Sequence, residues 1–209
     1  MVDWAARTPV VTALGIIAPI GDDPASFWQA LLSAKSGVGP VRCFDTSAFA
    51  THIGCEIHSP LVHAMAAQYP NIGRASLLAM IAGKQALEGL SKQQRHSTGL
   101  CIGKTMGEAC WLEAWDPDAV RIGPQAVPSA ELLHSGPDQI GLDCMQLLDL
   151  RGPLQVLAAA CAAGNYAIAR AADLIRLGRV ERVLAGGTDA FSRVAYTGFA
   201  RLGALANEA

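Results

Sequence analysis

RGPLQVLAAACAAGNYAIARAADLIRLGRVERVLAGGTDA, residues 151–190, is the stretch that decides the fold. Its first part, residues 154–160, is apolar apart from Gln155, which is typical of a strand buried on both faces. A helical pattern follows up to Leu177, and Gly178 stands where a left-handed residue commonly ends a helix. A second stretch, residues 180–186, is apolar apart from Glu181 and Arg182 and predicts another strand. Two strands around one helix indicate a right-handed βαβ unit and an α/β fold with a mainly parallel sheet.

A cysteine stands at the junction between the first strand and the helix. Cys161 follows the apolar run with no polar loop between them, so we expect its sulfur at the first turn of the helix. The partial positive charge and free N–H groups of a helix N-terminus favour the nucleophilic thiolate, and they can also hold an oxyanion. The small residues Ala162, Ala163 and Gly164 leave room for a bulky acyl chain. The alternative is a buried structural cysteine, since cysteine is among the most buried residue types.

The motifs around Cys161 resemble the nucleophile segment of the β-ketoacyl synthases of the thiolase superfamily. LRGP, ACAAG, IRLG and AGGTDA follow one another in the family's order. VVTALGIIAPIG near the N-terminus, followed by FWQALLSAKSGVGP, resembles the opening of the same family. The resemblance implies a thiolase-like fold. In that fold, residues 1–209 form the N-terminal βαβαβ half of a synthase, with a mainly parallel sheet covered by helices.

The resemblance also implies an activity and a set of partners. The activity is decarboxylative Claisen condensation of acyl and malonyl thioesters in fatty acid or polyketide biosynthesis, through an acyl-Cys161 intermediate. The implied partners are acyl carrier protein or coenzyme A thioesters and a second copy or related synthase in a dimer, with no cofactor and no metal. Met106 matches a position that gates the acyl pocket in the family, so Met106, Ala162, Ala163 and Gly164 are candidates for substrate binding.

Two other functions stay open at this point. One is a non-catalytic chain-length partner subunit, and the other is a coenzyme A-dependent, thiolase-like acyltransferase. The presence of Cys161 favours an enzyme, because chain-length partners usually lack the nucleophile. The opening motifs and LRGP argue against a thiolase.

The histidines of the chain lie on the wrong side of the cysteine for a complete synthase. All five precede Cys161, whereas the family's two active-site histidines follow the cysteine, in a second half that also supplies an oxyanion N–H. We therefore expect the C-terminal half to be absent and this chain to be inactive alone in condensation. The spacing gives no support for His134 as a substitute base.

Composition excludes several classes of protein. The chain has 209 residues, of which 51% are hydrophobic and 16% charged, with a net charge of −2. This balance gives no reason to expect binding to nucleic acid or to a membrane surface. No apolar run is long enough for a transmembrane helix, and the N-terminus lacks a secretory pattern, so we expect a cytoplasmic protein. The six cysteines have no metal spacing and are interpreted as free thiols.

Two motifs outside the central stretch invite other functions. GLCIGKT resembles a phosphate-binding loop, but Thr98 stands where the first glycine of G-x-x-x-x-G-K-[ST] belongs, so we exclude nucleotide binding. His52, His58 and His63 lie near Cys55, but without the spacing that a zinc site needs.

The remaining elements are predicted from apolar runs, helical stripes and turn residues. We expect a strand over residues 9–14, a helix over 24–34 capped by Asp22 or Asp23, a small hairpin over 49–57, a helix over 74–90, a strand over 97–104 and two short helices over 130–150. Trp111 and Trp115 are four residues apart and are expected to share one helix face.

Overall fold

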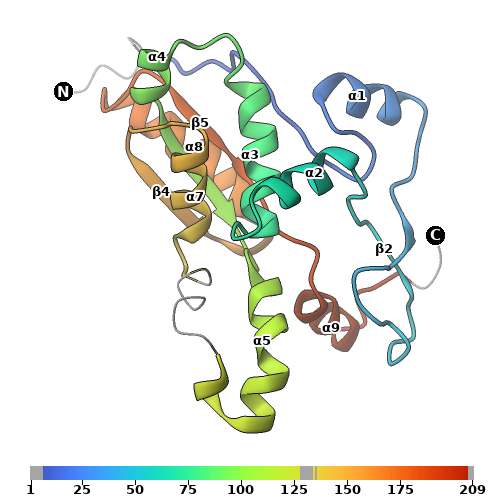
Figure 1. Cartoon of the computed structure of the whole chain (residues 1–209). Coiled ribbons are helices and arrows are strands. Elements are labelled where there is room, and N and C mark those ends of the chain that lie inside the picture. Colours follow the sequence, from blue (N-terminus) through green and yellow to red (C-terminus); the bar gives the residue numbers. More distant parts are fainter. Residues whose placement is uncertain (1–6, 128–133, 135, 207–209) are drawn as a thin grey trace.

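A parallel three-stranded sheet organises the molecule (Figure 1). The computed structural model describes residues 7–127, 134 and 136–206. The strands are β3 (Gly99–Lys104), β4 (Leu154–Ala158) and β5 (Val183–Gly187), in the order β4-β3-β5. β4 and β5 both pair with β3 in parallel, so helix α8 (Ala163–Arg176) connects the two outer strands across the central one. The α/β class with a parallel sheet is therefore confirmed.

Helices cover the sheet on both of its faces. Side chains alternate along a strand, so Leu100 and Ile102 of β3 point to one face and Cys101 to the other. Leu100 and Ile102 belong to the larger core, with helices α3 (Arg74–Ala86) and α7 (Gln139–Leu147). Cys101 packs against α8 in a smaller core. β3 is buried on both faces as a result.

The other elements surround this layered body. α1, α2 and α9 lie beside the sheet, and α5 extends away from it (Figure 1). Their bounds are α1 (Pro24–Leu32), β1 (Gly39–Pro40), β2 (Ile53–Gly54), α2 (Pro60–Gln68), α4 (Lys92–His96), α5 (Ala109–Ile122) and α9 (Arg193–Arg201), with single 3₁₀ turns η1 (Pro124–Ala126) and η3 (Ala160–Ala162).

Local end signals were reliable predictors of helix boundaries. Asp23 caps α1 by accepting the N–H groups of Ala25 and Ser26, and Pro24 occupies the first turn. Gly178 follows α8 with a φ of +66°, the left-handed conformation expected of it. Trp111 and Trp115 stack on one face of α5, with ring centroids 5.8 Å apart.

The predicted strand over residues 9–14 is wrong. These residues have no strand assignment, and Val10 and Val11 are 75% and 79% exposed. A strand needs hydrogen-bonding partners, and the described sheet ends at β5 without reaching this segment. The chain instead contacts helix α3 just after this segment, where the Ile16 N–H donates to Gln85 Oε1 at 2.8 Å.

The hairpin over residues 49–57 is also wrong. β2 pairs antiparallel with β1, so its partner comes from residues 39–40 and not from the adjacent chain. Other boundaries shift by a few residues: the helix predicted over 74–90 ends at Ala86, and the strand predicted over 97–104 begins at Gly99, after the short helix α4.

The strand predicted over 154–160 ends at Ala158 and is only half-buried, because β4 lies at an edge of the sheet. Of the two short helices expected over 130–150, α7 is present. Residues 128–133 and 135 lie outside the described residues.

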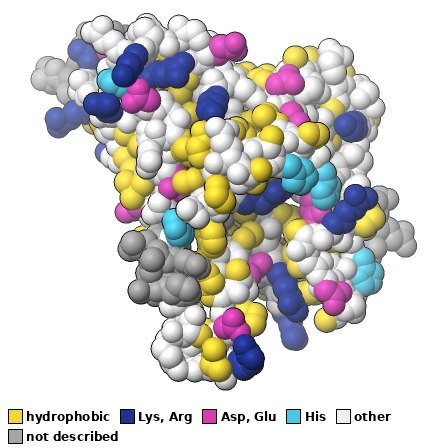
Figure 2. Space-filling view, in the orientation of Figure 1, with side chains coloured by type: hydrophobic (Ala, Val, Ile, Leu, Met, Phe, Trp, Pro, Cys, Tyr) yellow, Lys and Arg dark blue, Asp and Glu magenta, His cyan; other side chains and the backbone are white. Residues whose placement is uncertain are grey.

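Apolar and charged side chains both lie on the described surface. Figure 2 shows apolar side chains spread over one face between several small groups of charged ones. Within the described residues, no helix has the length and apolar character needed to cross a membrane.

Candidate active site at the carboxyl edge of the sheet

Three loops meet at one edge of the sheet because its strands are parallel. β3 ends at Lys104, β4 at Ala158 and β5 at Gly187, and the register places these ends side by side. The carboxyl edge of a parallel sheet is where α/β proteins commonly hold their ligands. The turns that follow these strands are therefore the natural place for a site.

Cys161 lies in the turn between β4 and α8, as the sequence predicts. The 3₁₀ turn η3 holds Ala160, Cys161 and Ala162, and α8 begins at the next residue. Ala160 has a φ of +46°, a left-handed conformation that is uncommon for a residue with a side chain. This sharp turn leaves Cys161 exposed at the start of α8, whose first turn has no side-chain cap.

Glycines allow the first turn of α8 to approach the sheet closely. A Cβ on Gly103 would overlap the backbone of Ala163 and would lie 2.6 Å from the Gly164 nitrogen. On β5, a Cβ on Gly187 would lie 3.2 Å from the Cα of Gly164. Backbone thus packs on backbone at the site, which holds the cysteine turn against the ends of β3 and β5.

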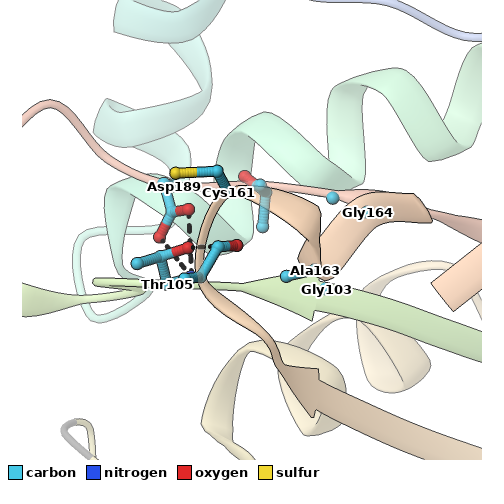
Figure 3. A pocket seen from close by; sticks show the side chains of 9 residues that line it. Gly103, Thr105, Cys161, Ala163, Gly164 and Asp189 are labelled. Atoms are coloured by element: carbon cyan, nitrogen blue, oxygen red, sulfur yellow. Dashed lines mark hydrogen bonds between the residues drawn. The ribbon is translucent and has the colours of Figure 1, made fainter. Parts of the chain in front are cut away.

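A shallow pocket of about 280 Å³ opens beside Cys161 (Figure 3). All three loops contribute to its walls: Gly103, Thr105, Ala160, Cys161, Ala163, Gly164, Gly187, Thr188 and Asp189. Of the predicted substrate-binding residues, Ala163 and Gly164 line this pocket, whereas Met106 and Ala162 do not. The roles of all four residues in substrate binding stay predictions.

Sequence reasoning missed three residues at this site: Thr105, Thr188 and Asp189. The Asp189 carboxylate accepts backbone N–H groups from the turn after β3, and Thr105 Oγ1 donates to the Ala160 carbonyl at 2.9 Å (Figure 3). Thr188 Oγ1 donates to the Ala75 carbonyl at 2.8 Å, which ties the loop after β5 to α3. Their position directly after predicted strands is the signal that could have found them.

Burial separates Cys161 from most of the other cysteines. It raises the pKa of Cys144 to about 12 and that of Cys110 to about 11, and it also raises the pKa of Cys101. Burial, together with the nearby Glu56 carboxylate, raises the pKa of Cys43 to about 12. A raised thiol pKa lowers the fraction of reactive thiolate at neutral pH.

Several histidines of the described chain have other partners. His52 contacts the Thr46 hydroxyl at 3.1 Å, and His58 lies 2.9 Å from the Glu56 carboxylate. Within residues 7–127, 134 and 136–206, no three His, Cys, Asp or Glu side chains gather as a metal-ligand set. His134 stacks on Trp111 with ring centroids 5.4 Å apart, and it is not among the residues that line the Cys161 pocket.

Residues 7–209 match the family model described as "Beta-ketoacyl synthase, N-terminal domain". The chain belongs to the β-ketoacyl synthase family. A relative from Coxiella burnetii, 3-oxoacyl-[acyl-carrier-protein] synthase 2, is 31% identical over 95% of this chain and 50% of its own length. Nodulation protein E from Rhizobium leguminosarum bv. trifolii is 33% identical over 88% of this chain and 47% of its own.

A solved structure has the same fold. The ishigamide ketosynthase/chain length factor superposes with a TM-score of 0.85 at 27% identity, over 97% of this chain and 52% of that chain. The fold is therefore that of the thiolase-like ketosynthases. The chain spans about half the length of the curated relatives it matches.

Proposed function

We propose that this chain is the nucleophile-bearing N-terminal domain of a β-ketoacyl-[acyl carrier protein] synthase, an acyltransferase of fatty acid or polyketide biosynthesis. The observation that carries the proposal is the position of Cys161. It is an exposed thiol on a strained strand-to-helix turn, at the mouth of a pocket formed by three loops. A nucleophile in such a turn is accessible to a thioester while its backbone stays fixed by the sheet.

The proposed step is transfer of an acyl group to the cysteine. The Cys161 thiolate attacks the thioester carbonyl, a new carbon–sulfur bond forms, and the bond to the carrier thiol breaks. The carrier leaves as a thiolate and takes a proton from solvent. The partial positive charge at the N-terminus of α8, which begins just after Cys161, is suited to stabilise the oxyanion of the tetrahedral intermediate.

The carrier and the assembly are part of the same proposal. The Coxiella relative is named for acyl carrier protein, which supports an acyl carrier protein thioester as donor, with coenzyme A thioesters as the other source. The ketosynthase/chain length factor supports a dimer of related synthase chains. We also propose a cytoplasmic location.

The complete condensation requires more than this chain contains. Decarboxylation of a malonyl thioester needs acid–base groups, and the described pocket contains none of the five histidines. Loss of one oxyanion donor alone commonly costs about a hundredfold or more in rate. We propose that residues 1–209 accept an acyl group but do not release carbon dioxide from a malonyl thioester.

Acyl transfer can be tested with a small thioester. The chain is incubated with octanoyl-N-acetylcysteamine, and the modified cysteine is located by intact-mass measurement and peptide mapping. We expect one octanoyl group on Cys161 in the parent chain and none at that peptide in Cys161→Ala. Cys55→Ala is the matched control, because it removes another exposed thiol and should leave acylation unchanged.

Absence of octanoyl-Cys161 in the folded parent would contradict the proposed function and would favour a non-catalytic partner subunit. A second assay measures carbon dioxide release from malonyl thioester with octanoylated chain. Carbon dioxide release above the level measured with Cys161→Ala would mean that residues 1–209 contain a base for decarboxylation, which the proposal does not include.

A further inference from the structure

The carboxylate of Asp189 organises a turn that lies more than eighty residues earlier in the chain. Its Oδ1 atom accepts the N–H groups of Met106 at 2.7 Å and Gly107 at 2.6 Å. The Thr105 N–H is shared between its two oxygens, at 3.0 Å from each. Hydrogen bonds from N–H groups to an ionised acceptor are stronger than neutral ones, so three consecutive bonds hold this turn in one conformation.

Thr105 connects the same turn to the residue before the cysteine. With its backbone held by Asp189, Thr105 directs its hydroxyl to the Ala160 carbonyl at 2.9 Å (Figure 3). Ala160 has the strained φ of +46°. An Ala residue keeps such a conformation only where its surroundings determine it, and this hydrogen bond is one such determinant.

The planarity of the peptide bond carries the effect to Cys161. The Ala160 carbonyl and the Cys161 N–H belong to one planar peptide unit, and no cis peptide bond is found among the described residues. In a trans peptide the two groups point in opposite directions. Fixing the carbonyl toward Thr105 therefore turns the Cys161 N–H to the other side and fixes the rotation of the turn that bears the sulfur.

We infer that Asp189 is a positioning residue for Cys161, acting through Thr105 and the peptide unit between Ala160 and Cys161. Its importance for acyl transfer rests on the proposed function, but the orientation of the turn does not. Asp189 is not the base of the site, because both of its oxygens are occupied by backbone N–H groups.

The test uses isosteric variants of the two residues in the 209-residue chain. Asp189→Asn replaces one acceptor oxygen by an NH₂ group, which cannot accept the turn's N–H groups. Thr105→Val removes the hydroxyl at constant shape, and Thr105→Ser restores it. Asp118→Asn is the matched control, because it removes an exposed carboxylate of an ion pair on α5, the helix that extends away from the sheet (Figure 1).

We expect Asp189→Asn and Thr105→Val each to slow octanoylation of Cys161 by about tenfold or more, because misplaced reacting groups lose rate steeply. The double variant should be no slower than either single variant, since both residues act through one peptide unit. Thr105→Ser should stay within about twofold of the parent, as should Asp118→Asn. Alkylation of Cys161 by iodoacetamide, which needs little orientation, should not slow in Asp189→Asn.

Equal losses in Thr105→Ser and Thr105→Val would overturn the inference, and so would additive losses in the double variant. Slower iodoacetamide alkylation in step with slower octanoylation would point to loss of thiolate or of folding, and would also overturn it.

A second readout is independent of acyl transfer. The NMR signal of the Cys161 amide should shift in the same direction in Asp189→Asn and Thr105→Val, and it should stay in place in Asp118→Asn. If the parent chain is not acylated, the proposed function fails while this readout still tests the positioning. An unmoved Cys161 amide in both variants would overturn the inference even if acylation occurs.

Discussion

The two faces of the sheet are built from side chains of different size. On the face of α3 and α7, the core contains long side chains, among them Met80, Leu100 and Ile140. On the face of α8, the buried residues are mostly small, with Cys101 of β3 packed on two alanines and one leucine of the helix. The first face buries the larger apolar volume, whereas the second lets a helix approach the strands closely. The difference suggests that stability and positioning of the nucleophile depend on separate halves of the core.

The outer side of α8 sharpens this contrast. Tyr166 and Ile168 are 59% and 55% exposed, so α8 covers the sheet with one side and leaves apolar side chains on the other. Buried alanines on its inner side, Ala167 and Ala171, keep it close to β3. The helix therefore serves to place its own N-terminus at the carboxyl edge more than to fill a core.

The largest expected effect is the difference in labelling rate between Cys161, at the carboxyl edge of the sheet, and a cysteine buried in the core. At pH 8, a thiol with a pKa of about 12, such as buried Cys144, has a thiolate fraction of only about 10⁻⁴, against about a quarter for an ordinary thiol. We expect Cys161 to react with iodoacetamide about a thousandfold or more faster than Cys144. It should also exceed exposed Cys55, which does not precede a helix. Peptide mapping after brief labelling measures all six rates, and a Cys161 rate at or below that of Cys55 would contradict an activated thiol.

Truncation on the α3 face should change stability alone. Met80 is fully buried, so Met80→Ala should lower the free energy of unfolding by about 2–5 kcal/mol, through lost burial and the cavity left behind. Urea unfolding followed by circular dichroism measures the loss. The ratio of Cys161 to Cys55 labelling in the folded variant should stay as in the parent, and a changed ratio would mean that the two faces are coupled.

A single methyl group on the α8 face should have the reverse effect. The Cβ of Gly103→Ala would overlap the backbone of Ala163, so the first turn of α8 must move away from β3. We expect a loss of about 1–3 kcal/mol from overpacking and a changed Cys161 labelling ratio. Gly186→Ala on β5 is the matched control, because its Cβ would meet nothing within 4 Å. If Gly103→Ala folds normally and its ratio of Cys161 to Cys55 labelling is unchanged, the close approach of α8 to β3 does not position Cys161.

The smallest expected effect concerns a buried carboxylate at the end of the Thr105 turn. Glu108 accepts the N–H groups of Ala75 and Ser76 at the start of α3, and burial raises its pKa above the ordinary value of 4.5 in spite of these bonds. Asp143, bonded to the Ser76 hydroxyl, raises the pKa of Glu108 further.

A folded-state pKa above the unfolded value means that the folded protein keeps the proton longer. The contribution of Glu108 to stability is therefore full at low pH, and it falls as pH rises from about 4.5 through the raised pKa of Glu108. In Glu108→Gln this part of the pH dependence should disappear. Thermal unfolding of the parent chain and of Glu108→Gln between pH 4 and 8 measures this pH dependence. If stability changes with pH in the same way in both proteins, the dependence does not come from Glu108.

Local sequence was enough to predict the strand, turn, helix and strand of residues 151–190. The end of α8 at Gly178 and the cap of α1 at Asp23 depend on backbone conformation and on hydrogen bonds within a few residues. The apolar run before Cys161 likewise required nothing from the rest of the chain, although the strand proved half-buried because it lies at a sheet edge.

The two wrong predictions concern elements that depend on segments elsewhere in the chain. The segment over residues 9–14 has the composition of a strand, but pairing depends on a partner elsewhere, and the described sheet offers none. The hairpin over 49–57 failed for the same reason, since β2 finds its partner in residues 39–40. Neither outcome can be read from the local pattern, because β pairing is a contact between distant segments.

By itself, the sequence determined the elements of residues 151–190, the parallel α/β class and the placement of Cys161 at a strand-to-helix turn. Only the tertiary structure decided the strand order β4-β3-β5 and the joining of Asp189, Thr105 and Ala160 around the cysteine. The physical reason is the range of the interactions. Apolar periodicity and helix capping act within a few residues, whereas the Asp189 carboxylate and the Thr105 amide are 84 residues apart and meet only once three parallel strands end at one edge.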